Sequence, residues 1–264
     1  MPQEKRYLVD VGLKGFPFPM RVLSKQDPDG QATVARISCH ARINHEFEAR
    51  WIDRFIRTLH EHRDTIGTRT LRDNIRDYVA QMDAASVKID FEYPVFIAKE
   101  TPVSHQRCLI AYDCCYSVKV TSSNGQPKVV FRMDIPAITT DPASDPDLEG
   151  GLFGQLSVVT IEVRSARDLY PEYLVSLVDR HALSPIYSFL TRDDQIQVIR
   201  NIHSGRKSSV VMTDEIKEDL AANPDIDWYA VSCANNGMLH SYSTVVATEQ
   251  NILTPAGAFE DDSI

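Results

Sequence analysis

The chain has 264 residues, a formal net charge of -9 at pH 7, 43% hydrophobic residues and 25% charged residues, which is the balance of a globular protein that can bury a large core. The acidic excess argues against a general nucleic-acid binder, which needs a basic face to neutralise phosphates. No stretch approaches the roughly 18 continuous apolar residues of a membrane span, and residues 1–6 are polar, so we expect a cytoplasmic protein that does not bind a membrane.

The cysteines also exclude some classes of site. Their number, five, is odd and no C-x-x-C pair is present, which argues against a disulfide framework and against a thiolate zinc site. Most of them lie in apolar strand patterns, where we interpret them as buried, inert thiols. Cys233 as a nucleophile is the less favoured alternative.

The first predicted elements are two strands. Residues 32–43 alternate between apolar and polar side chains, which indicates a half-buried strand. Residues 10–23 read as its hairpin partner, in which Pro17 and Pro19 indicate a sheet edge or a bulge.

Two helices and two more strands are expected next. Residues 47–59 and 71–82 carry apolar side chains at helical spacing, and Gly67 between them is a natural stop. Strict alternation then returns over residues 87–97 and 108–118, which predicts another pair of strands.

The second half of the chain repeats this order after a turn at residues 121–126, which contains Asn-Gly. Its expected elements are strands over 129–135 and 159–163, a helical region over 169–190 that is broken near Ser184-Pro185, a further helical stretch over 193–220, and strands over 228–234 and 239–247. Hairpins with helices on one face predict an α+β sheet. Because a curved sheet has edges that need covering, the pattern also favours a homo-oligomer.

Five parts of the sequence share a pattern with a known family: residues 10–19, residues 93–104 (YPVFIAKETPVS), Gln155, residues 157–161 and the pair His240-Ser241. Together they resemble the type IB GTP cyclohydrolase family. The resemblance covers about residues 9–247. It implies the tunnelling fold (T-fold) with two ββααββ modules in one chain, and a substrate pocket at the subunit junction of a dimer or tetramer.

The implied domain is a single bimodular T-fold domain over residues 1–264. We place module one at about 7–121, module two at about 127–248, and a tail at 249–264.

Members of the resembled family open the imidazole ring of GTP by hydrolysis and rebuild a pterin, using a divalent metal, usually zinc, to activate water. This chain departs from the family at three ligand positions. Asp141 stands where the metal-binding cysteine would be, Phe153 in place of the liganding histidine, and Gln195 in place of a carboxylate. The departures lead us to expect neither a metal site nor a cofactor.

The candidate catalytic residues are His240, Asp141 and Gln155. His240 resembles a retained family histidine and could act as a general acid or base, or it could be a hydrogen-bonded strand residue. Gln155 could contact substrate or satisfy the backbone. With Asp145 and Asp147, Asp141 could also bind a hard cation, although a solvated acidic loop is the favoured interpretation.

The candidate substrate-binding residues are Ser104, His105, Phe153, Gln195 and Asn235. His105 stands where the family usually has glycine and could reshape the pocket. Asn235 aligns near a carboxylate that grips the N–H edge of a purine or pterin, and an amide there binds without charge assistance. We interpret residues 204–209 (SGRKSS) as a basic surface loop, since they lack the full phosphate-loop pattern.

Three functions follow from these observations. The main hypothesis is a T-fold hydrolase or cyclase with altered, metal-independent chemistry on a small nitrogen-containing molecule in a specialised biosynthetic pathway. The first alternative is a true GTP cyclohydrolase, converting GTP to dihydroneopterin triphosphate, with substitute metal ligands. The second alternative is a non-catalytic paralogue that binds a metabolite or regulates a partner.

Overall fold

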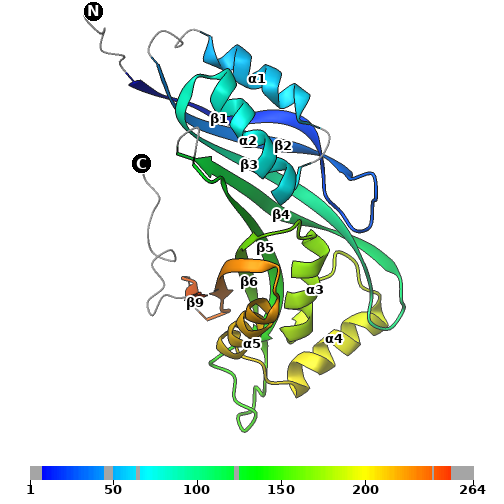
Figure 1. Cartoon of the computed structure of the whole chain (residues 1–264). Coiled ribbons are helices and arrows are strands. Elements are labelled where there is room, and N and C mark those ends of the chain that lie inside the picture. The colour runs from blue at the N-terminus through cyan, green and yellow to red at the C-terminus, as the bar shows by residue number, and fades with distance from the viewer. Residues whose placement is uncertain (1–7, 45–49, 64–65, 122–124, 240, 251–264) are drawn as a thin grey trace, which may run out of the picture. The chain divides into compact units, whose positions relative to one another are not determined.

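The structure is a computed structural model that describes residues 8–44, 50–63, 66–121, 125–239 and 241–250 (Figure 1). Its elements, in chain order, are β1 (Leu8–Val22), β2 (Gln31–Asn44), α1 (Trp51–Glu61), α2 (Thr68–Gln81), β3 (Ala84–Glu100), β4 (Arg107–Val120), β5 (Lys128–Thr140), β6 (Gly154–Ser165), α3 (Pro171–His181), β7 (Ser184–Pro185), α4 (Arg192–Ser204), α5 (Ser209–Ala222), β8 (Ile226–Asn236) and β9 (Thr244–Glu249).

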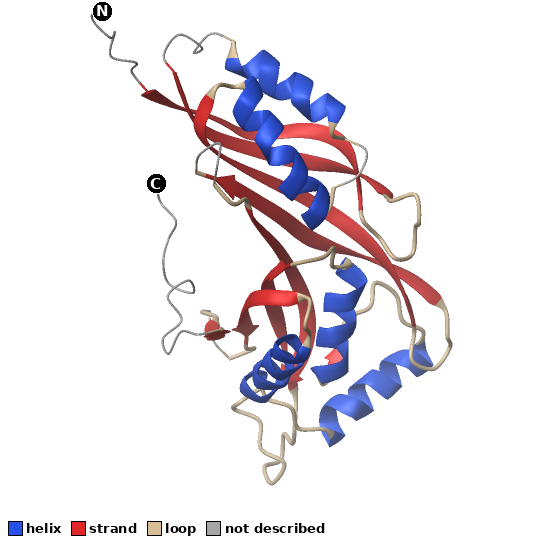
Figure 2. Ribbon diagram, viewed as in Figure 1, coloured by secondary structure: helices blue, strands red, loops and turns tan. Residues whose placement is uncertain are grey.

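The strands are hydrogen-bonded in the order β1-β2-β3-β4-β5-β6-β8-β9, and the short β7 pairs with β5 (Figure 2). The pairs β1–β2, β2–β3, β5–β7 and β8–β9 are antiparallel. This is the sheet of hairpins that the alternating sequence pattern predicts.

Contacts divide the chain into two compact units. The first comprises Met1–Val95, Asp113–Arg132 and Arg164–Tyr170; the second comprises Phe96–Tyr112, Met133–Val163 and Pro171–Ile264. These boundaries cut through β3, β4, β5 and β6, because strands of 12 to 17 residues are long enough to contribute to more than one core. The expected division into two sequential modules stays a prediction.

In the first unit, α1 and α2 bury their apolar faces. Phe55 and Tyr78 meet with ring centroids 5.7 Å apart, which joins the two helices to each other. On the sheet side, the rings of Tyr116 and Phe131 stack at 4.5 Å, and both side chains are buried. Aromatic pairs of this kind contribute beyond their buried area.

In the second unit, α3 and α5 pack together, and α5 also packs on β8. The helix α5 buries Met212, Ile216 and Leu220, which recur at the spacing of one helix face. Burying such a face is the main source of a helix's stability in a protein.

The predicted alternation is confirmed strand by strand. All of the apolar positions that were expected to share a face in β2, β3, β4, β5 and β6 are buried. The strand β1 lies at a sheet edge and has a register shift between Leu13 and Phe16, where Gly15 takes a positive φ of 67°. Both features implied by the prolines are therefore present, and glycine makes the bulge possible.

The helices differ from the expectation in the second half. It holds three helices in place of two, since the stretch predicted over 193–220 is divided into α4 and α5 by Gly205, which ends α4. Residues 47–49 of the helix predicted over 47–59, residues 122–124 of the predicted turn and residues 251–264 of the predicted tail lie outside the described residues. The strand β9 ends at Glu249, the first residue assigned to the tail.

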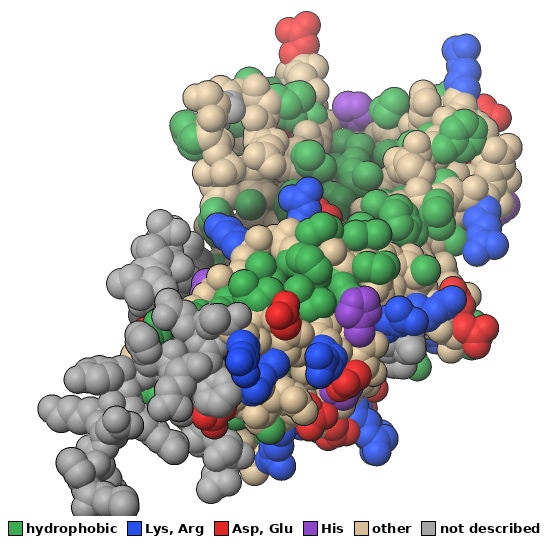
Figure 3. Space-filling view, turned by 90° about the horizontal axis from the view of Figure 1, so that it is seen from above, with side chains coloured by type: hydrophobic (Ala, Val, Ile, Leu, Met, Phe, Trp, Pro, Cys, Tyr) green, Lys and Arg blue, Asp and Glu red, His purple; other side chains and the backbone are tan. Residues whose placement is uncertain are grey.

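Apolar side chains also reach the surface of the described chain. Figure 3 shows hydrophobic side chains next to Lys and Arg on the visible face. On whichever face they lie, the exposed apolar residues of the described chain include Ile196 and Ile199 on α4, and Met238, Leu239 and Tyr242 after β8.

Within the ranges that the structure describes, every helix is too short or too polar to cross a membrane.

We expect the Tyr116–Phe131 stack to be essential for stability. Replacing Phe131, which is 1% exposed, by alanine should lower the free energy of unfolding by about 3–5 kcal/mol, because a cavity forms and the stacking is lost. The control Phe189→Ala removes a ring that is 50% exposed and should change it by less than about 0.5 kcal/mol. Urea unfolding followed by circular dichroism measures both, and equal midpoints would contradict the assignment of Phe131 to the core.

Candidate functional site

The second unit contains a group of buried polar side chains where β5, β6 and β8 meet their loops. We call it the strand-end cluster; its members are Thr139, Thr140, Asp141, Gln155, Ser157, Ser209 and Asn235. All are at most 6% exposed. A buried polar group is costly unless it is hydrogen-bonded, so this concentration has to be organised by internal bonds.

The centre of the cluster is a chain of hydrogen bonds between three strands. The hydroxyls of Thr139 and Ser157 share a hydrogen bond of 2.8 Å, and the Ser157 hydroxyl donates to Asn235 Oδ1 at 2.8 Å. Gln155 Nε2 donates to Thr139 Oγ1 at 3.3 Å. Three of the residues predicted from sequence, Asp141, Gln155 and Asn235, therefore lie in one cluster.

Asn235 is engaged by protein partners at both ends of its amide. Its Nδ2 donates to Ser209 Oγ at 3.0 Å and to Thr244 Oγ1 at 3.4 Å, while its Oδ1 accepts from Ser157 and from the thiol of Cys233. An amide offers two donors and two acceptor sites, so these bonds saturate it. The geometry favours a role for Asn235 in holding β8 and α5 at the cluster.

Asp141 and Gln155 present acceptor oxygens next to Gly237. A β-carbon built on Gly237 would lie 3.2 Å from Asp141 Oδ2 and 3.7 Å from Gln155 Oε1. The other carboxylate oxygen of Asp141 accepts from Ala143 N at 2.9 Å, and the backbone N of Asp141 donates to the carbonyl of Phe153 at 3.0 Å. Two acceptor oxygens therefore lie close to the point where a side chain at residue 237 would begin.

The thiol of Cys233 lies beside this cluster and is fully buried. Burial raises the pKa of Cys233 to about 11, against a hydrogen bond with Ser157 that lowers it. The thiol is therefore protonated at neutral pH, as an inert buried cysteine is.

Ser104 belongs to a different arrangement, which we call the Asp194 cluster: Val103, Ser104, Thr191 and Asp194. Asp194 Oδ1 accepts from the backbone N atoms of Val103 and Ser104, both at 2.9 Å, and its Oδ2 accepts from Ser104 Oγ at 2.7 Å. Thr191 and Asp194 also form the reciprocal capping box of α4. One buried carboxylate therefore joins the loop after β3 to the start of α4.

These bonds determine the charge state of Asp194. Burial raises the pKa of its carboxyl, but the hydrogen bonds from Ser104, Thr191 and Val103 outweigh burial and hold the pKa below its usual range. Sequence reasoning missed Asp194, although its spacing from Thr191 is the signal of a capping box.

The other residues predicted from the sequence, Gln195, His105, His240 and Phe153, lie in different surroundings. The side chain of Gln195 is exposed and donates to Leu190 O at 3.3 Å. His105 is exposed and has a φ of 51°, a left-handed conformation that favours glycine and explains why a glycine would suit this position. His240 lies outside the described residues. Phe153 is half-buried and serves the cluster through its carbonyl.

Lys99, within the family-like stretch 93–104, is held in a buried ion pair. Its Nζ lies 2.5 Å from Asp179 Oδ2 on α3 and 5.4 Å from the centre of the Tyr112 ring. Burial raises the pKa of Asp179, and the nearby Lys99 lowers it. The pair fixes the end of β3 to α3, which gives this motif residue a structural role.

A zinc site, which the resemblance implies for the family, needs about three protein ligands with nitrogen, sulfur or carboxylate donors. At the three positions in question, only Asp141 has such a donor: Phe153 has none in its side chain, and Gln195 carries a neutral amide. Over the described parts of the chain, no group of three or more His, Cys, Asp or Glu could hold a metal ion. The described residues of one chain therefore do not fit the family's zinc.

The acidic loop after β5 gives the same result. Asp145 and Asp147 are exposed, and Asp145 Oδ1 accepts from the backbone N of Asp147 at 3.0 Å. This is the geometry of a solvated turn, in which the side chain bonds its own backbone two residues on.

Comparison with known protein families identifies the family of this chain. A family model described as type I GTP cyclohydrolase FolE2 matches residues 1–246. The chain belongs to the FolE2 family. The expected kinship with GTP cyclohydrolases is thus confirmed, and the description that the match supports is type I FolE2 in place of the type IB label.

Relatives with the name GTP cyclohydrolase FolE2 match over most of their length. The protein from Pelobacter propionicus is 29% identical over 249 residues, which is 94% of this chain and 95% of that protein. The protein from Geobacter sulfurreducens is 29% identical over 241 residues, covering 91% of this chain and 92% of the relative.

Solved structures show a likeness of fold alone. A uricase from Bacillus fastidious superposes with a TM-score of 0.53 at 9% identity, covering 93% of each chain. A highly active BTUO mutant gives a TM-score of 0.55 at 6% identity, covering 91% of this chain and 99% of that one. These similarities support a T-fold-like architecture for this FolE2 family member.

The lowered pKa of Asp194 predicts a pH-dependent stability. Its ionised form stabilises the fold above the unfolded-state pKa of about 3.9, and this contribution is lost as the pH falls through the lower folded-state value. Asp194→Asn presents an N–H group to backbone donors and should lower the unfolding midpoint by about 5 °C at pH 7.

The difference between wild type and this variant should shrink as the pH falls below about 4. Thermal unfolding between pH 7 and pH 2 measures it. Asp193→Asn, at the exposed neighbouring position, is the matched control and should follow the wild type. A difference that did not change with pH would refute the role of the ionised carboxylate.

Proposed function

We propose that the chain is a GTP cyclohydrolase, which converts GTP to dihydroneopterin triphosphate. The observation that carries this proposal is membership of the FolE2 family over residues 1–246, together with FolE2 relatives that match over nearly their whole length. It favours the true GTP cyclohydrolase over the altered chemistry that the sequence departures led us to expect.

The strand-end cluster supports a site for a purine ring. Asp141 Oδ2 and Gln155 Oε1 lie on the same side of Gly237 and are both acceptors. The edge of guanine offers two adjacent donors, N1–H and N2–H2, which match a pair of acceptor oxygens. We infer that Asp141 and Gln155 accept these hydrogen bonds, and the bond to the carboxylate is the stronger because it is charge-assisted.

The other residues have supporting roles in this proposal. Ser157, Asn235 and Ser209 keep β6, β8 and α5 in register around the acceptor pair, because each is bonded to the next. The catalytic roles of His240, Asp141 and Gln155 stay predictions, as do the substrate contacts of Ser104, His105, Phe153 and Gln195.

A second candidate is a metal-independent reaction on a related nitrogen-containing molecule. The specific observation in its favour is the pair of positions at Phe153 and Gln195, which lack metal-binding groups. A non-catalytic paralogue is the remaining alternative. The cytoplasmic location and the homo-oligomer with a pocket between subunits also stay predictions.

Turnover of GTP with controlled metal content separates these candidates. We expect purified protein to consume GTP and to form a fluorescent pterin after oxidation, followed by chromatography. If turnover stops after chelation and returns with Zn²⁺ or Mn²⁺, substitute ligands are at work. If it persists after chelation, the reaction is metal-independent. Absence of GTP consumption under all of these conditions would overturn the proposed function.

The acceptor pair gives a sharper test. The methyl group of Gly237→Ala would come within 3.2 Å of Asp141 Oδ2, so it should hinder the approach of a ring and raise KM about tenfold, with a smaller effect on kcat. The matched control is Gly150→Ala, because an added methyl meets no atom within 4 Å there. Steady-state kinetics with GTP measures both variants, and unchanged kinetics for Gly237→Ala would exclude the acceptor pair as the substrate site.

A further inference from the structure

The loop between α4 and α5 is bonded to two sides of the strand-end cluster. The backbone N of Lys207 donates to Thr140 Oγ1 at 2.7 Å, and the backbone N of Thr140 donates to Lys207 O at 2.8 Å. Two residues further on, Ser209 Oγ, at the start of α5, accepts from Asn235 at 3.0 Å. The loop and the first residue of α5 therefore contact the end of β5 next to Asp141 and the end of β8.

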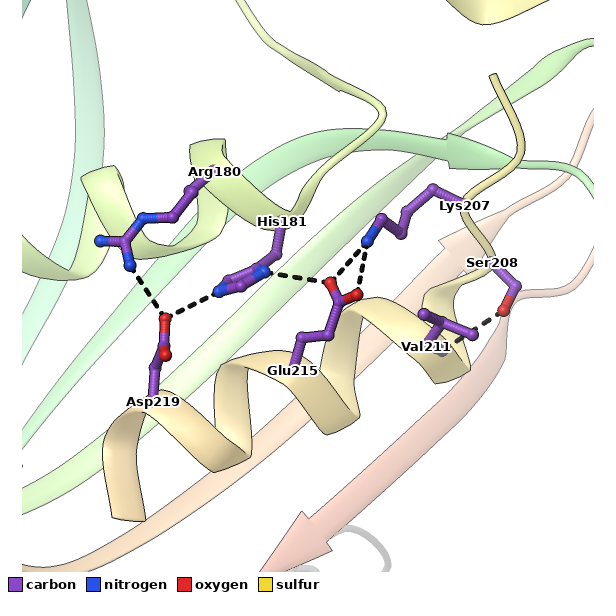
Figure 4. Close-up of polar contacts among 7 residues, drawn as sticks. All are labelled: Arg180, His181, Lys207, Ser208, Val211, Glu215 and Asp219. Carbon is purple, nitrogen blue, oxygen red and sulfur yellow. Dashed lines mark hydrogen bonds and ion pairs between the residues drawn. The ribbon is translucent and has the colours of Figure 1, made fainter. Parts of the chain in front are cut away.

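The side chain of Lys207 binds the loop to α5 (Figure 4). Its Nζ contacts both carboxylate oxygens of Glu215, at 2.7 Å and 2.5 Å. The hydrogen bond from Lys207 lowers the pKa of Glu215, against burial, which raises it. Glu215 is therefore ionised at neutral pH, and the pair is a charge-assisted clamp.

The clamp extends across two helices as a row in which basic and acidic side chains alternate, which we call the charge row. The ring of His181, the last residue of α3, contacts Glu215 Oε2 at 3.0 Å through Nδ1 and Asp219 Oδ2 at 2.8 Å through Nε2. Arg180 Nη1 lies 3.0 Å from the same oxygen of Asp219. Glu215 and Asp219 are four residues apart and share one face of α5, so the row joins α3 to α5.

The basic side chains are also placed where a helix end favours them. Arg180 and His181 lie in the last turn of α3, where the partial negative charge of the helix dipole attracts the Arg180 guanidinium. At the other end of the row, Ser208 caps α5 by accepting a hydrogen bond from Val211 N. The loop is thus held by its own cap, by Thr140 and by the charge row.

We propose that Lys207 is a positioning residue for the strand-end cluster, whose ion pair with Glu215 holds the α4–α5 loop so that Thr140 and Ser209 keep β5 and β8 in place around Asp141. The proposal rests on the proposed function for its kinetic consequence, but its structural consequence is independent of GTP. An ion pair between partly exposed side chains contributes little to the free energy of unfolding. We therefore expect its loss to change the structure only locally.

Three variants test the proposal. Lys207→Met removes the cation and keeps an aliphatic side chain, whereas Lys207→Arg retains the charge. The matched control Lys217→Met removes a lysine of α5 that pairs more loosely, with Nζ 3.6 Å from Asp214 Oδ1.

The first readout is amide hydrogen exchange of the segment that contains Thr140. In Lys207→Met we expect exchange to accelerate about two- to fivefold, in proportion to the loss of one such pair, while Lys207→Arg and Lys217→Met stay at the wild-type rate. The thermal unfolding midpoint, measured in parallel, shows whether a variant is folded. Wild-type exchange in a folded Lys207→Met protein would overturn the proposal.

The second readout is the kinetics of GTP turnover. Displacement of the cluster in Lys207→Met should lower kcat by about three- to tenfold with KM changed much less, because misplacing groups around a reacting centre weakens catalysis more than binding. Lys207→Arg should restore kcat. An unchanged kcat in a Lys207→Met protein that exchanges faster would overturn the link to catalysis. If Lys207→Met exchanges faster but the wild type does not turn over GTP, the proposed function is refuted and the clamp is supported.

Discussion

Burying polar side chains at the ends of three strands is the constraint on which the second unit depends. Each buried donor or acceptor needs a partner, because an unpaired one costs more free energy than its hydrogen bond would contribute. Ser157 meets this requirement by linking Thr139 on β5 to Asn235 on β8. The strand ends are therefore fixed in relation to one another by specific bonds, in addition to the apolar packing beneath them.

Helix ends provide the remaining partners. The first residue of α5, Ser209, accepts the hydrogen bond of Asn235, and the loop before it bonds Thr140 in both directions. At the start of α4, the single carboxylate of Asp194 accepts from two backbone N atoms of the loop after β3. In both places, residues at a helix N-terminus hydrogen-bond to polar groups of a neighbouring strand end or loop. These bonds make irregular backbone possible next to a packed core.

Family membership and local chemistry provide different kinds of information about this protein. The FolE2 match over residues 1–246 identifies the family, and the uricase structures support only the architecture. Phe153 and Gln195 do not carry the donors that a zinc site requires. What the site offers instead is a pair of oxygen acceptors, and function has to be argued from such groups because one fold supports many reactions.

The sequence by itself determined the sheet and most of its core. Alternation over β2 to β6 predicted the buried face because successive side chains of a strand point to opposite sides. The same alternation extends into the site. Gln155 and Ser157 precede Val159 and Ile161 on the buried face of β6, so extending the buried face through polar residues would have identified two members of the cluster.

Only the tertiary structure decided which polar residues meet. Thr139, Ser157 and Asn235 are up to 96 residues apart in the sequence, and their partnership depends on strand order, which local pattern does not specify. The same holds for Asp194 with Ser104, and for His181 with Glu215. Periodicity reports which face of an element is buried, but the partner of a buried polar group is a property of the assembled fold, since it depends on distances between elements.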